Sequence, residues 1–298
     1  MNKFLKGQVL FLIGALILFV PHWRISYNNW VQGQLIINYE EQFKMEDKTT
    51  LINELKEYNE RVSPHQVQLN DPFHEDGYYS IANEKIPFQQ GEIIGYIEIP
   101  KLMETLPIYI GATNDNLKKG VAVVESTSLP IGGLNTHSVL AGHRGYGYAN
   151  IFRHIDDLEK GDIFQIHILG EVLTYTIYGK EIINPNQTEK LAIIPEQDIV
   201  TLLTCHPFLS NTSRLLVKAY RTDNKEEEDN YLIEQNIEQE DIFQKSENSS
   251  FSRIFKISVS RSFVQYHLFN RLMSYLGIGV IAINIIFIVK LHKKKSED

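Results

Sequence analysis

Two long apolar runs, one near each end of the chain, stand out in the pattern of hydrophobic and polar positions. Neither Gln8–Val20 nor Leu272–Val289 contains a charged residue. Because roughly 20 apolar residues cross a bilayer, Leu272–Val289 predicts a transmembrane helix. Gln8–Val20 is shorter, and the bulky segment Pro21–Arg24 follows it in place of a small-residue cleavage site. This first run therefore predicts a signal anchor that is retained.

Lysines flank both runs on the side of the chain ends. Lys3 and Lys6 precede the first run, and Lys290 and the cluster Lys293–Lys295 follow the second. An excess of positive charge in short flanking segments marks the cytoplasmic side of a membrane. The pattern predicts a protein of the cell membrane with two spans, with both termini in the cytoplasm and the region between the spans outside the cell.

The exported region begins with helical spacing. Asn38–Val62 places apolar residues on one face among alternating charges, which predicts a helix that ends before Pro64. Leu69–Asp76 is a polar cluster typical of turns, with Phe73 as an apolar residue inside it. A helix followed by a turn therefore precedes the main domain.

From Gly91 onward the apolar residues fall into short runs, which turn signals such as Gly132-Gly133 separate. Ala149–Lys160 is predicted as a short helix that ends at Gly161. About eight short strands within about 130 residues favour a closed, mostly β barrel over a βαβ fold. The predicted strands are Gly95–Ile99, Leu106–Ile110, Gly120–Val124, Ser138–Ala141, Ile163–Leu169, Leu173–Tyr178, Val200–Thr204 and Leu215–Tyr220.

Composition and charge fit a globular domain with appended segments. Apolar residues make up 43% and charged residues 22% of the chain, near the averages for globular proteins. The net charge of −8 comes from Thr222–Ser250, which holds ten acidic and two basic residues and predicts a linker. The net charge of −8 argues against general binding to nucleic acid. Without Thr222–Ser250 the chain is neutral, so the charge of the main domain says nothing about its partner. The expected segments are an anchor (1–23), a helical segment with the turn cluster (24–90), the barrel (91–221), the acidic linker and juxtamembrane segment (222–271), the second span (272–290) and a cytoplasmic tail (291–298).

The chain has a single cysteine, Cys205, so an intramolecular disulfide and a cysteine-rich zinc site are excluded. A single cysteine is most often a small buried apolar residue. Cys205, however, directly follows a predicted strand, His143 follows another, and Arg214 opens the next strand along the chain. Strand ends are where a rigid scaffold presents reactive groups, so these three side chains are candidates for one site.

Cysteine, histidine and arginine together suffice for acyl transfer. The thiolate is the nucleophile, and because free cysteine has a pKa of ~8.5, a neighbouring imidazole that takes the proton activates it. The imidazole can later protonate a leaving amine, and a fixed guanidinium can stabilise the oxyanion. A single histidine is often structural, and His206 is a rival base beside Cys205, although adjacent strand residues point to opposite faces. His137 and His154 have no comparable context.

Three parts of the sequence resemble the motifs of the sortase family. Thr201–Arg221 reads TLLTCHPFLSNTSRLLVKAYR and resembles the signature TLxTC followed by an arginine that opens the next strand. His137–Gly147 reads HSVLAGHRGYG and resembles the histidine motif. Gly95–Lys101 (GYIEIPK) and Leu106–Gly111 (LPIYIG) resemble the opening strands. The resemblance covers about half of the chain and implies the closed eight-stranded sortase β-barrel.

The resemblance also implies an activity and the residues that perform it. Cys205 would be the nucleophile, His143 the acid and base, Arg214 the stabiliser of the oxyanion, and Thr204 would line the substrate groove. Sortases cleave a Leu-Pro-X-Thr-Gly-like sorting signal between threonine and glycine, hold the acyl group on the cysteine, and transfer it to an amine. No cofactor is implied, and no acidic cluster in the sequence indicates a calcium site.

Class C sortases, which polymerise pili, carry a lid with an Asp-Pro-aromatic motif and often a second span. Asp71-Pro72-Phe73 matches this motif, and Leu272–Val289 matches the span. The resemblance implies that Asp71 pairs with Arg214 while Phe73 covers the reactive cleft. The implied partners are pilins or other surface proteins that carry the sorting signal, with a pilin lysine as the amine.

Three alternatives stay open at this point. A housekeeping sortase would use an amine of the cell-wall precursor, although such enzymes usually have one N-terminal anchor and no lid. A cysteine hydrolase would use water in place of the amine. A non-catalytic membrane-anchored adhesin or scaffold would not need a cysteine at a strand end. His206-Pro207 departs from many pilus sortases, so the sequence leaves the substrate preference open.

Overall fold

The structure is a computed structural model, and it describes residues 3–43, 48–62, 71–73, 86–144, 151–208, 210–222 and 272–290. The expected acidic linker beyond Thr222 and the expected tail at 291–298 lie outside the described residues. The chain divides into two compact units. One comprises Met1–Val31 and Lys256–Asp298, and the other comprises Gln32–Phe255.

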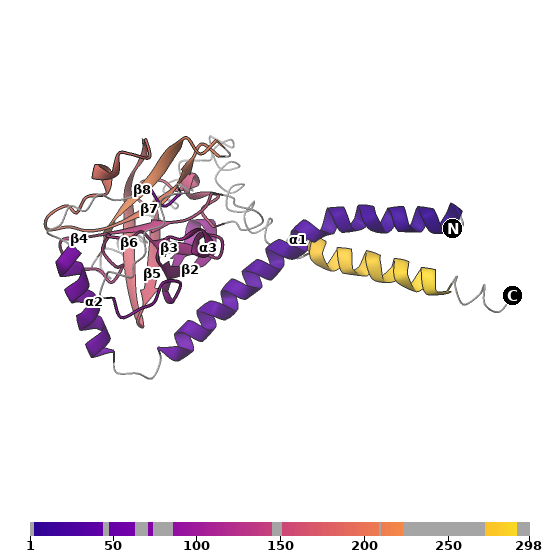
Figure 1. The fold of residues 1–298 in the computed structure, drawn as a ribbon, viewed down its shortest axis with the longest axis horizontal. Helices are drawn as coiled ribbons and strands as arrows, with labels where there is room; N and C mark the ends of the chain where they lie inside the picture. The colour runs from indigo at the N-terminus through magenta and orange to yellow at the C-terminus, as the bar shows by residue number, and fades with distance from the viewer. Residues whose placement is uncertain are drawn as a thin grey trace, which may run out of the picture. The chain divides into compact units, whose positions relative to one another are not determined.

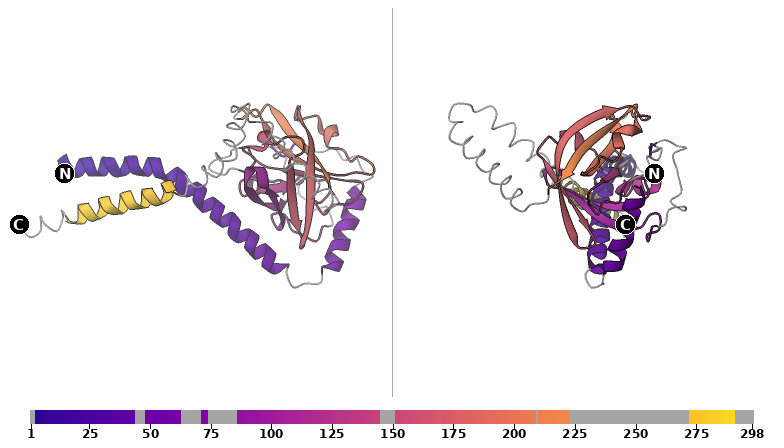
Figure 2. Two further views of the ribbon diagram at one scale, coloured as in Figure 1. Left: turned by 180° about the vertical axis from the view of Figure 1, so that it is seen from behind. Right: turned by 90° about the vertical axis from the view of Figure 1, so that its left-hand side faces the viewer.

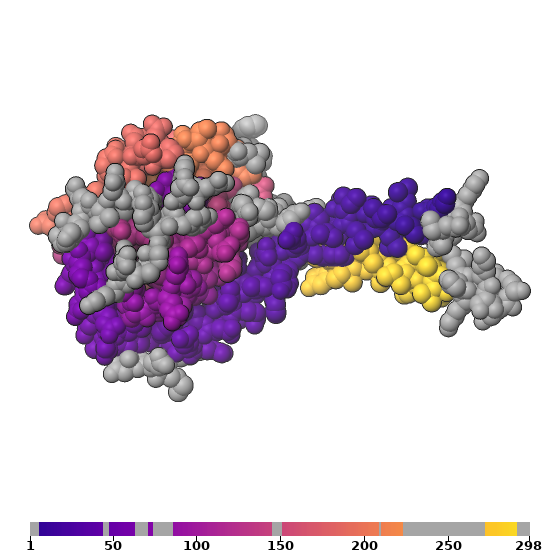
Figure 3. Space-filling model, viewed as in Figure 1, coloured from indigo at the N-terminus to yellow at the C-terminus, as the bar shows by residue number. Residues whose placement is uncertain are grey.

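The first unit contains two long apolar helices. Helix α1 (Lys3–Gln42), whose N-terminal part belongs to this unit, and the C-terminal helix Leu272–Lys290 are each long and apolar enough to cross a membrane. Figures 2 and 3 show the indigo N-terminal part of α1 beside the yellow C-terminal helix. Asn284 Nδ2 donates a hydrogen bond to Gln8 Oε1 at 2.8 Å, and Gly277 lies so close to Phe19 that an added Cβ would be 2.5 Å from its ring. Small residues and polar pairs are what join helices in lipid.

The helical region before the barrel differs from the prediction of a single helix over Asn38–Val62. Its first residues are the end of α1, and a second helix, α2 (Thr49–Val62), follows. Near the end of α1, the Tyr39 hydroxyl donates to the Ile94 carbonyl at 2.6 Å and accepts from the Leu169 backbone N–H at 2.8 Å. This buried hydroxyl fastens the end of α1 to a strand of the barrel at Ile94 and to a turn at Leu169, which sequence periodicity alone does not reveal.

The predicted closed barrel of eight strands is confirmed. Neighbouring strands around the barrel are β1-β2-β3-β4-β7-β8-β6-β5, and Figure 1 shows them wrapped around a common core. The pairs β2–β3 and β4–β7 are parallel, and the other pairs are antiparallel. The strands are β1 (Ile93–Ile99), β2 (Glu104–Ile110), β3 (Val121–Val123), β4 (Thr136–Ala141), β5 (Ile163–Ile168), β6 (Glu171–Ile183), β7 (Asp198–His206) and β8 (Ser213–Arg221).

The burial of the strands and the place of β7 in the barrel determine what surrounds the C-terminal end of β7. β5 alternates between buried and half-buried positions, as expected of a strand with one face toward the core. β7 is buried at seven successive positions, from Ile199 to Cys205, because both of its faces are covered. β7 lies between β4 and β8 in the barrel. Its C-terminal end therefore lies beside residues that extend from β4 and residues that begin β8.

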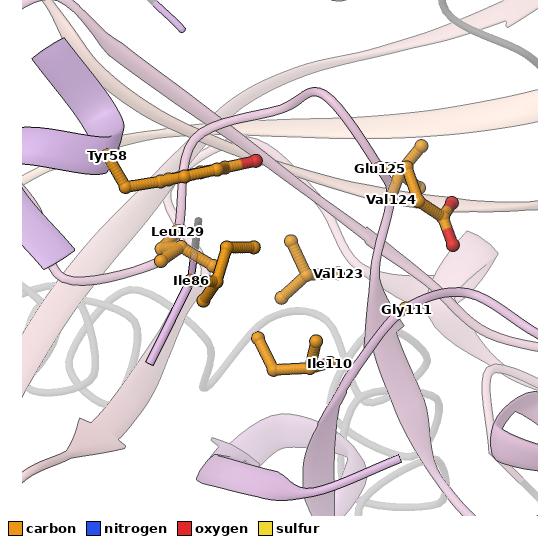
Figure 4. Close-up of a pocket in the computed structure, with 8 residues that line it drawn as sticks. All are labelled: Tyr58, Ile86, Ile110, Gly111, Val123, Val124, Glu125 and Leu129. Atoms are coloured by element: carbon orange, nitrogen blue, oxygen red, sulfur yellow. The ribbon is translucent and has the colours of Figure 1, made fainter. Parts of the chain in front are cut away.

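Helix α2 lies along the barrel next to the connection between β3 and β4 (Figure 1). Asn59 donates to the Leu129 carbonyl at 3.1 Å and accepts from the Leu129 N–H at 2.7 Å, so one buried amide replaces two backbone partners. A small pocket lies between α2 and the barrel, and its apolar side chains face one another (Figure 4). It is lined by Tyr58, Ile86, Ile110, Gly111, Val123, Val124, Glu125 and Leu129.

The predicted helix Ala149–Lys160 is wrong for its described part. Only Ile155–Asp157 forms a single 3-10 turn, η3, and the residues around it are turns. Ile151, Phe152, Ile155 and Leu158 have the spacing of a helical face, but all four are buried in the barrel end. Their burial holds the segment in place without a helix. The backbone N–H of Phe152 also donates a hydrogen bond to the backbone carbonyl of His143 at 3.0 Å.

Candidate active site

Cys205 and Arg214 lie directly opposite each other on neighbouring strands. Cys205 is the second-last residue of β7, and its register partner on the antiparallel strand β8 is Arg214. Opposite residues of an antiparallel pair project from the same face of the sheet. Cys205 is 6% exposed, so the thiol is almost removed from water.

His143 reaches the same end of the barrel through the parallel pair β4–β7. Ala141 is the partner of Leu203, and the Gly142 N–H continues the ladder by donating to the Leu203 carbonyl at 3.0 Å. Two residues further along each chain, this register brings His143 to the level of Cys205. The barrel thus brings together the three residues that the sequence singled out.

Thr204 does not line an open groove in this structure, in contrast to the expectation. It is fully buried, and its hydroxyl donates to the Gly142 carbonyl at 2.7 Å. The bond joins the residue before Cys205 to the residue before His143. In this closed site the Thr204 hydroxyl therefore links the two reactive segments and is shielded from a substrate.

Arg214 is held by an aspartate from outside the barrel. Its Nε donates to Asp71 Oδ1 at 2.8 Å, and its Nη2 forms a second, shorter contact with Asp71 Oδ2. Its Nη1 donates to the carbonyls of Asn211 and Ser213 at 2.9 and 2.8 Å. The side chains of Arg214 and Asp71 are only 7% and 10% exposed. A bidentate pair that is this well shielded is stronger than a surface ion pair.

Phe73 lies across the reactive groups two residues after Asp71. Its ring centroid is 5.6 Å from that of His143, and the Arg214 guanidinium lies 5.3 Å from the ring. The ring also packs against the apolar cluster that contains Ala141, Leu203 and Leu216. Phe73 therefore covers the end of β7.

Burial keeps the reactive pair uncharged. It raises the pKa of the Cys205 thiol to about 11, which the Arg214 charge opposes and the Asp71 charge reinforces. It lowers the pKa of His143 to about 4, and the positive charge of Lys118 adds to this effect. At neutral pH the covered site therefore holds a thiol beside a neutral imidazole.

The other histidines considered as bases have different partners. His206 Nδ1 accepts a hydrogen bond from Arg144 Nη1 at 3.0 Å, so this nitrogen has a partner other than the Cys205 thiol. His137 is buried between the Ala192 carbonyl and the Thr201 hydroxyl, at 2.8 and 2.7 Å. His154 lies on the surface, 3.4 Å from an Asp157 oxygen.

Sequence reasoning missed Arg144 and Asp156. Arg144 directly follows His143, and its guanidinium forms a close ion pair with Asp156 of η3. The available signal was the arginine that directly follows His143 within the histidine motif. Within the described ranges, no group of three or more His, Cys, Asp or Glu side chains is placed to hold a metal ion. The pocket of Figure 4 contains neither Cys205 nor the residues around it.

Known proteins resemble this chain over the barrel. The family model described as "Sortase domain" matches residues 97–222. Sortase D of Bacillus subtilis (strain 168) is 33% identical over 129 residues, which cover 43% of this chain and 62% of that protein. The aligned region is thus less than two thirds of that relative's length.

Solved structures match more completely. Sortase C1 of GBS Pilus Island 1 has a TM-score of 0.57 and 33% identity, covering 65% of this chain and 93% of that chain. Clostridium perfringens sortase C with the C-terminal cell wall sorting motif has a TM-score of 0.55 and 38% identity, covering 63% and 98%. Both fold and sequence agree over nearly the whole length of these sortase C chains. The chain therefore belongs to the sortase family.

Proposed function

We propose that the chain is a cysteine transpeptidase that cleaves a Leu-Pro-X-Thr-Gly-like sorting signal and transfers the acyl group to an amine. The observation that carries the proposal is the meeting of three side chains at one barrel end. Cys205 and Arg214 are opposite each other, and the β4–β7 register brings His143 beside them. Membership in the sortase family supports the same chemistry.

The reaction proceeds in two acyl transfers. The sulfur of Cys205 attacks the threonine carbonyl carbon, His143 takes the thiol proton, and the oxyanion is stabilised by Arg214. The bond to glycine breaks as His143 returns the proton to the leaving amine, which leaves a thioester on Cys205. An incoming amine then loses a proton to His143 and attacks the thioester. The new amide forms, and the sulfur leaves and regains the proton.

Asp71 and Phe73 act as a lid that closes the resting site. All three guanidinium nitrogens of Arg214 donate hydrogen bonds, to Asp71 and to the carbonyls of Asn211 and Ser213. While they are so engaged, the guanidinium is not free to stabilise an oxyanion. Departure of the lid exposes the thiol and the imidazole to water, which moves both pKa values back toward the range where a proton can pass between them.

The amine is a lysine of a pilin, and the enzyme works at the outer face of the cell membrane. The pilus assignment is supported by the likeness to a sortase C1 of a pilus island and by the Asp71–Phe73 contacts with the site. The two helices that are long and apolar enough to cross a membrane support two spans. Both chain ends are then cytoplasmic, as the flanking lysines indicate.

The activity is tested with the full chain in nanodiscs and a sorting-signal peptide, by mass spectrometry of the protein. An acyl adduct is expected on Cys205, and none on Cys205→Ala. His143→Gln is expected to lose at least about 100-fold in turnover, as for other acid–base residues. His154→Gln, a surface histidine, is the matched control. An adduct on another residue would end the proposal.

Acceptor and topology are tested separately. Addition of a lysine peptide should release the adduct as a new amide, and a cell-wall stem peptide should do so more slowly. The reverse order would indicate a housekeeping enzyme. Protease added to intact cells should reach the barrel, whereas a tag after Asp298 should be protected. Cleavage of that tag would overturn the assignment of cytoplasmic termini.

A further inference from the structure

A second buried guanidinium lies at the end of β7, apart from the pair of Arg214 and Asp71. The Arg144 side chain is 8% exposed and pairs with the carboxylate of Asp156. Its Nη1 donates to His206 Nδ1 at 3.0 Å, and its Nε donates to the Arg153 carbonyl at 3.5 Å. A buried guanidinium with partners on each side is a rigid, planar connector.

The guanidinium of Arg144 connects the two segments that carry the reactive groups. Arg144 is the residue after His143, and His206 is the residue after Cys205. Asp156, the third partner, belongs to η3, whose backbone is fixed by a bond of 2.8 Å from Lys180 Nζ to the Asp156 carbonyl. The separation of His143 and Cys205 is therefore constrained immediately beyond both residues.

We propose that Arg144 is a positioning residue for the His143–Cys205 pair. It sets the distance between the two segments, and it holds His206 in the tautomer in which Nδ1 accepts a hydrogen bond. His206 is thereby kept from competing for the thiol proton. The inference rests on the proposed transpeptidase chemistry for its consequence, but the contacts do not depend on which substrate is used.

The Arg144 guanidinium combines a positive charge with a fixed arrangement of contacts, and a lysine cannot provide both. The guanidinium reaches Asp156, His206 and the Arg153 carbonyl with three different nitrogens. A lysine ammonium is a point charge on a flexible stem, so it can keep the charge without keeping this fixed geometry. Misplacement of reactive groups by about 1 Å costs on the order of 100-fold in rate.

The first experiment compares Arg144→Lys and Arg144→Gln with wild type in the full chain in nanodiscs. Both variants should lower kcat for acyl transfer by on the order of 10- to 100-fold while KM for the peptide changes little, because alignment is lost and not substrate contact. Arg153→Gln is the matched control. The Arg153 side chain lies 5.5 Å from the centroid of the Phe208 ring, and its replacement leaves the backbone carbonyl that Arg144 contacts in place. The kcat of Arg153→Gln should therefore stay near the wild-type value.

The second experiment asks what His206 does. His206→Gln keeps an oxygen that can accept from Arg144, whereas His206→Leu does not. If His206 serves as an acceptor, the leucine variant loses about 10-fold and the glutamine variant recovers most of the activity. Equal loss in both variants would mean that the imidazole itself is needed, and the proposal would be wrong. In chain labelled with ¹⁵N-histidine, the Nδ1 signal of His206 should move toward the protonated range in Arg144→Gln.

The third experiment separates this proposal from the proposed function. Alkylation of Cys205 by iodoacetamide needs no sorting signal, and Phe73→Ala removes the cover so that access does not limit the rate. In that background, Arg144→Gln should slow alkylation several-fold, because a misaligned imidazole activates the thiol less well. A slowed alkylation without any acyl adduct in wild type would sink the transpeptidase and keep the positioning role. An unchanged alkylation rate in Arg144→Gln would refute the positioning role alone.

Discussion

Two buried arginines flank the end of β7, and each pairs with an aspartate, yet the two pairs are built differently. Asp71 lies 143 residues before Arg214 and comes from outside the barrel, whereas Asp156 lies 12 residues after Arg144 and belongs to the barrel's own turn η3. The segment of Asp71 is held against the barrel by the buried Pro72 and by Phe73, whose ring lies beside His143 and Arg214 and packs against the apolar cluster. Asp156 is backed by Lys180 and by a buried apolar segment.

This difference explains how the end of β7 can be covered at rest while His143 and Cys205 stay in position. Under the proposed function, Asp71 leaves Arg214 together with the segment that carries it when a substrate enters. Arg144 joins the segments that hold His143 and Cys205, and its aspartate stays. Breaking a buried pair by removal of one partner costs about 3–5 kcal/mol, so a pair that must open needs replacement partners, such as an oxyanion, on opening. The following predictions test this contrast.

The largest effect is expected from Arg214. Arg214→Gln should lower kcat for acyl transfer by at least 100-fold, as when an oxyanion donor is removed. Opening the lid should not restore it, so Arg214→Gln with Phe73→Ala should be as slow as Arg214→Gln alone. Single-turnover mass spectrometry of the acyl-enzyme measures both. If the double variant recovered activity, Arg214 would serve the lid and not the reaction.

The next effect concerns the lid itself. Asp71→Ala combined with Phe73→Ala should speed labelling of Cys205 by a small thiol reagent by roughly 10- to 100-fold. The reason is that the covered ring and the ion pair together stabilise the closed state by a few kcal/mol. Phe88→Ala, in the segment that leads into β1, is the control. Labelling that stays at the wild-type rate would leave Asp71–Phe73 as a simple turn before the barrel.

Some features of the barrel and of the site could be predicted from the sequence, and others could not. The eight strands follow from local alternation and turn residues, and the three reactive residues follow from motifs at strand ends. The network of Arg144 could not be predicted, because it depends on β4 and β7 being parallel neighbours, which joins residues 62 positions apart. The buried position of Thr204 depends on the same pairing. The spacing of Ile151, Phe152, Ile155 and Leu158 predicted a helix, whereas tertiary burial decides their backbone.

A smaller effect should separate access from activation. In the covered site the pKa of Cys205 is about 11, so in wild type the alkylation rate should keep rising with pH beyond the range of an ordinary cysteine. In Phe73→Ala the desolvation is relieved, and the midpoint should fall toward ~8.5. The measurement is iodoacetamide labelling between about pH 6 and 10. A labelling rate that is still rising at about pH 10 in both chains would mean that Phe73 limits entry without desolvating the thiol.

The acid side of the profile concerns stability. Burial lowers the pKa of both His137 and His143 to about 4, so these imidazoles bind fewer protons in the folded chain than in the unfolded chain between pH 6.5 and 4, and their contribution to the free energy of unfolding falls with the pH. Burial raises the pKa of Glu104 to about 8, so this carboxyl opposes the histidines in the same window. For the deeply buried His137 the loss is at most about 3 kcal/mol. Denaturant titration at several pH values measures it, and His137→Gln should flatten the dependence. The same pH dependence in wild type and His137→Gln would contradict the burial of the His137 imidazole.

The smallest effect is expected from a single methyl group on the fixed side of the contrast. Gly142 precedes His143, and a Cβ there would lie 2.6 Å from Phe152 Cδ2 and 3.0 Å from Ile151 Cγ2. Gly142→Ala should push the Phe152 segment outward, at a cost of about 1–3 kcal/mol, and lower kcat several-fold through the displaced histidine. Gly179→Ala is the control, because a Cβ at Gly179 meets no atom within 4 Å.

The pair of glycine variants distinguishes a fixed scaffold from an adaptable one. If the segment after β4 is as rigid as the Arg144 contacts require, the melting temperature and kcat of Gly142→Ala should fall together, while Gly179→Ala changes neither. Cys205 labelling should not speed up as it does in the lid variants, since the cover is untouched. If Gly142→Ala melted earlier but kept the wild-type kcat, the segment could relax around the methyl group without moving His143. The two arginine pairs would then differ in location and not in rigidity.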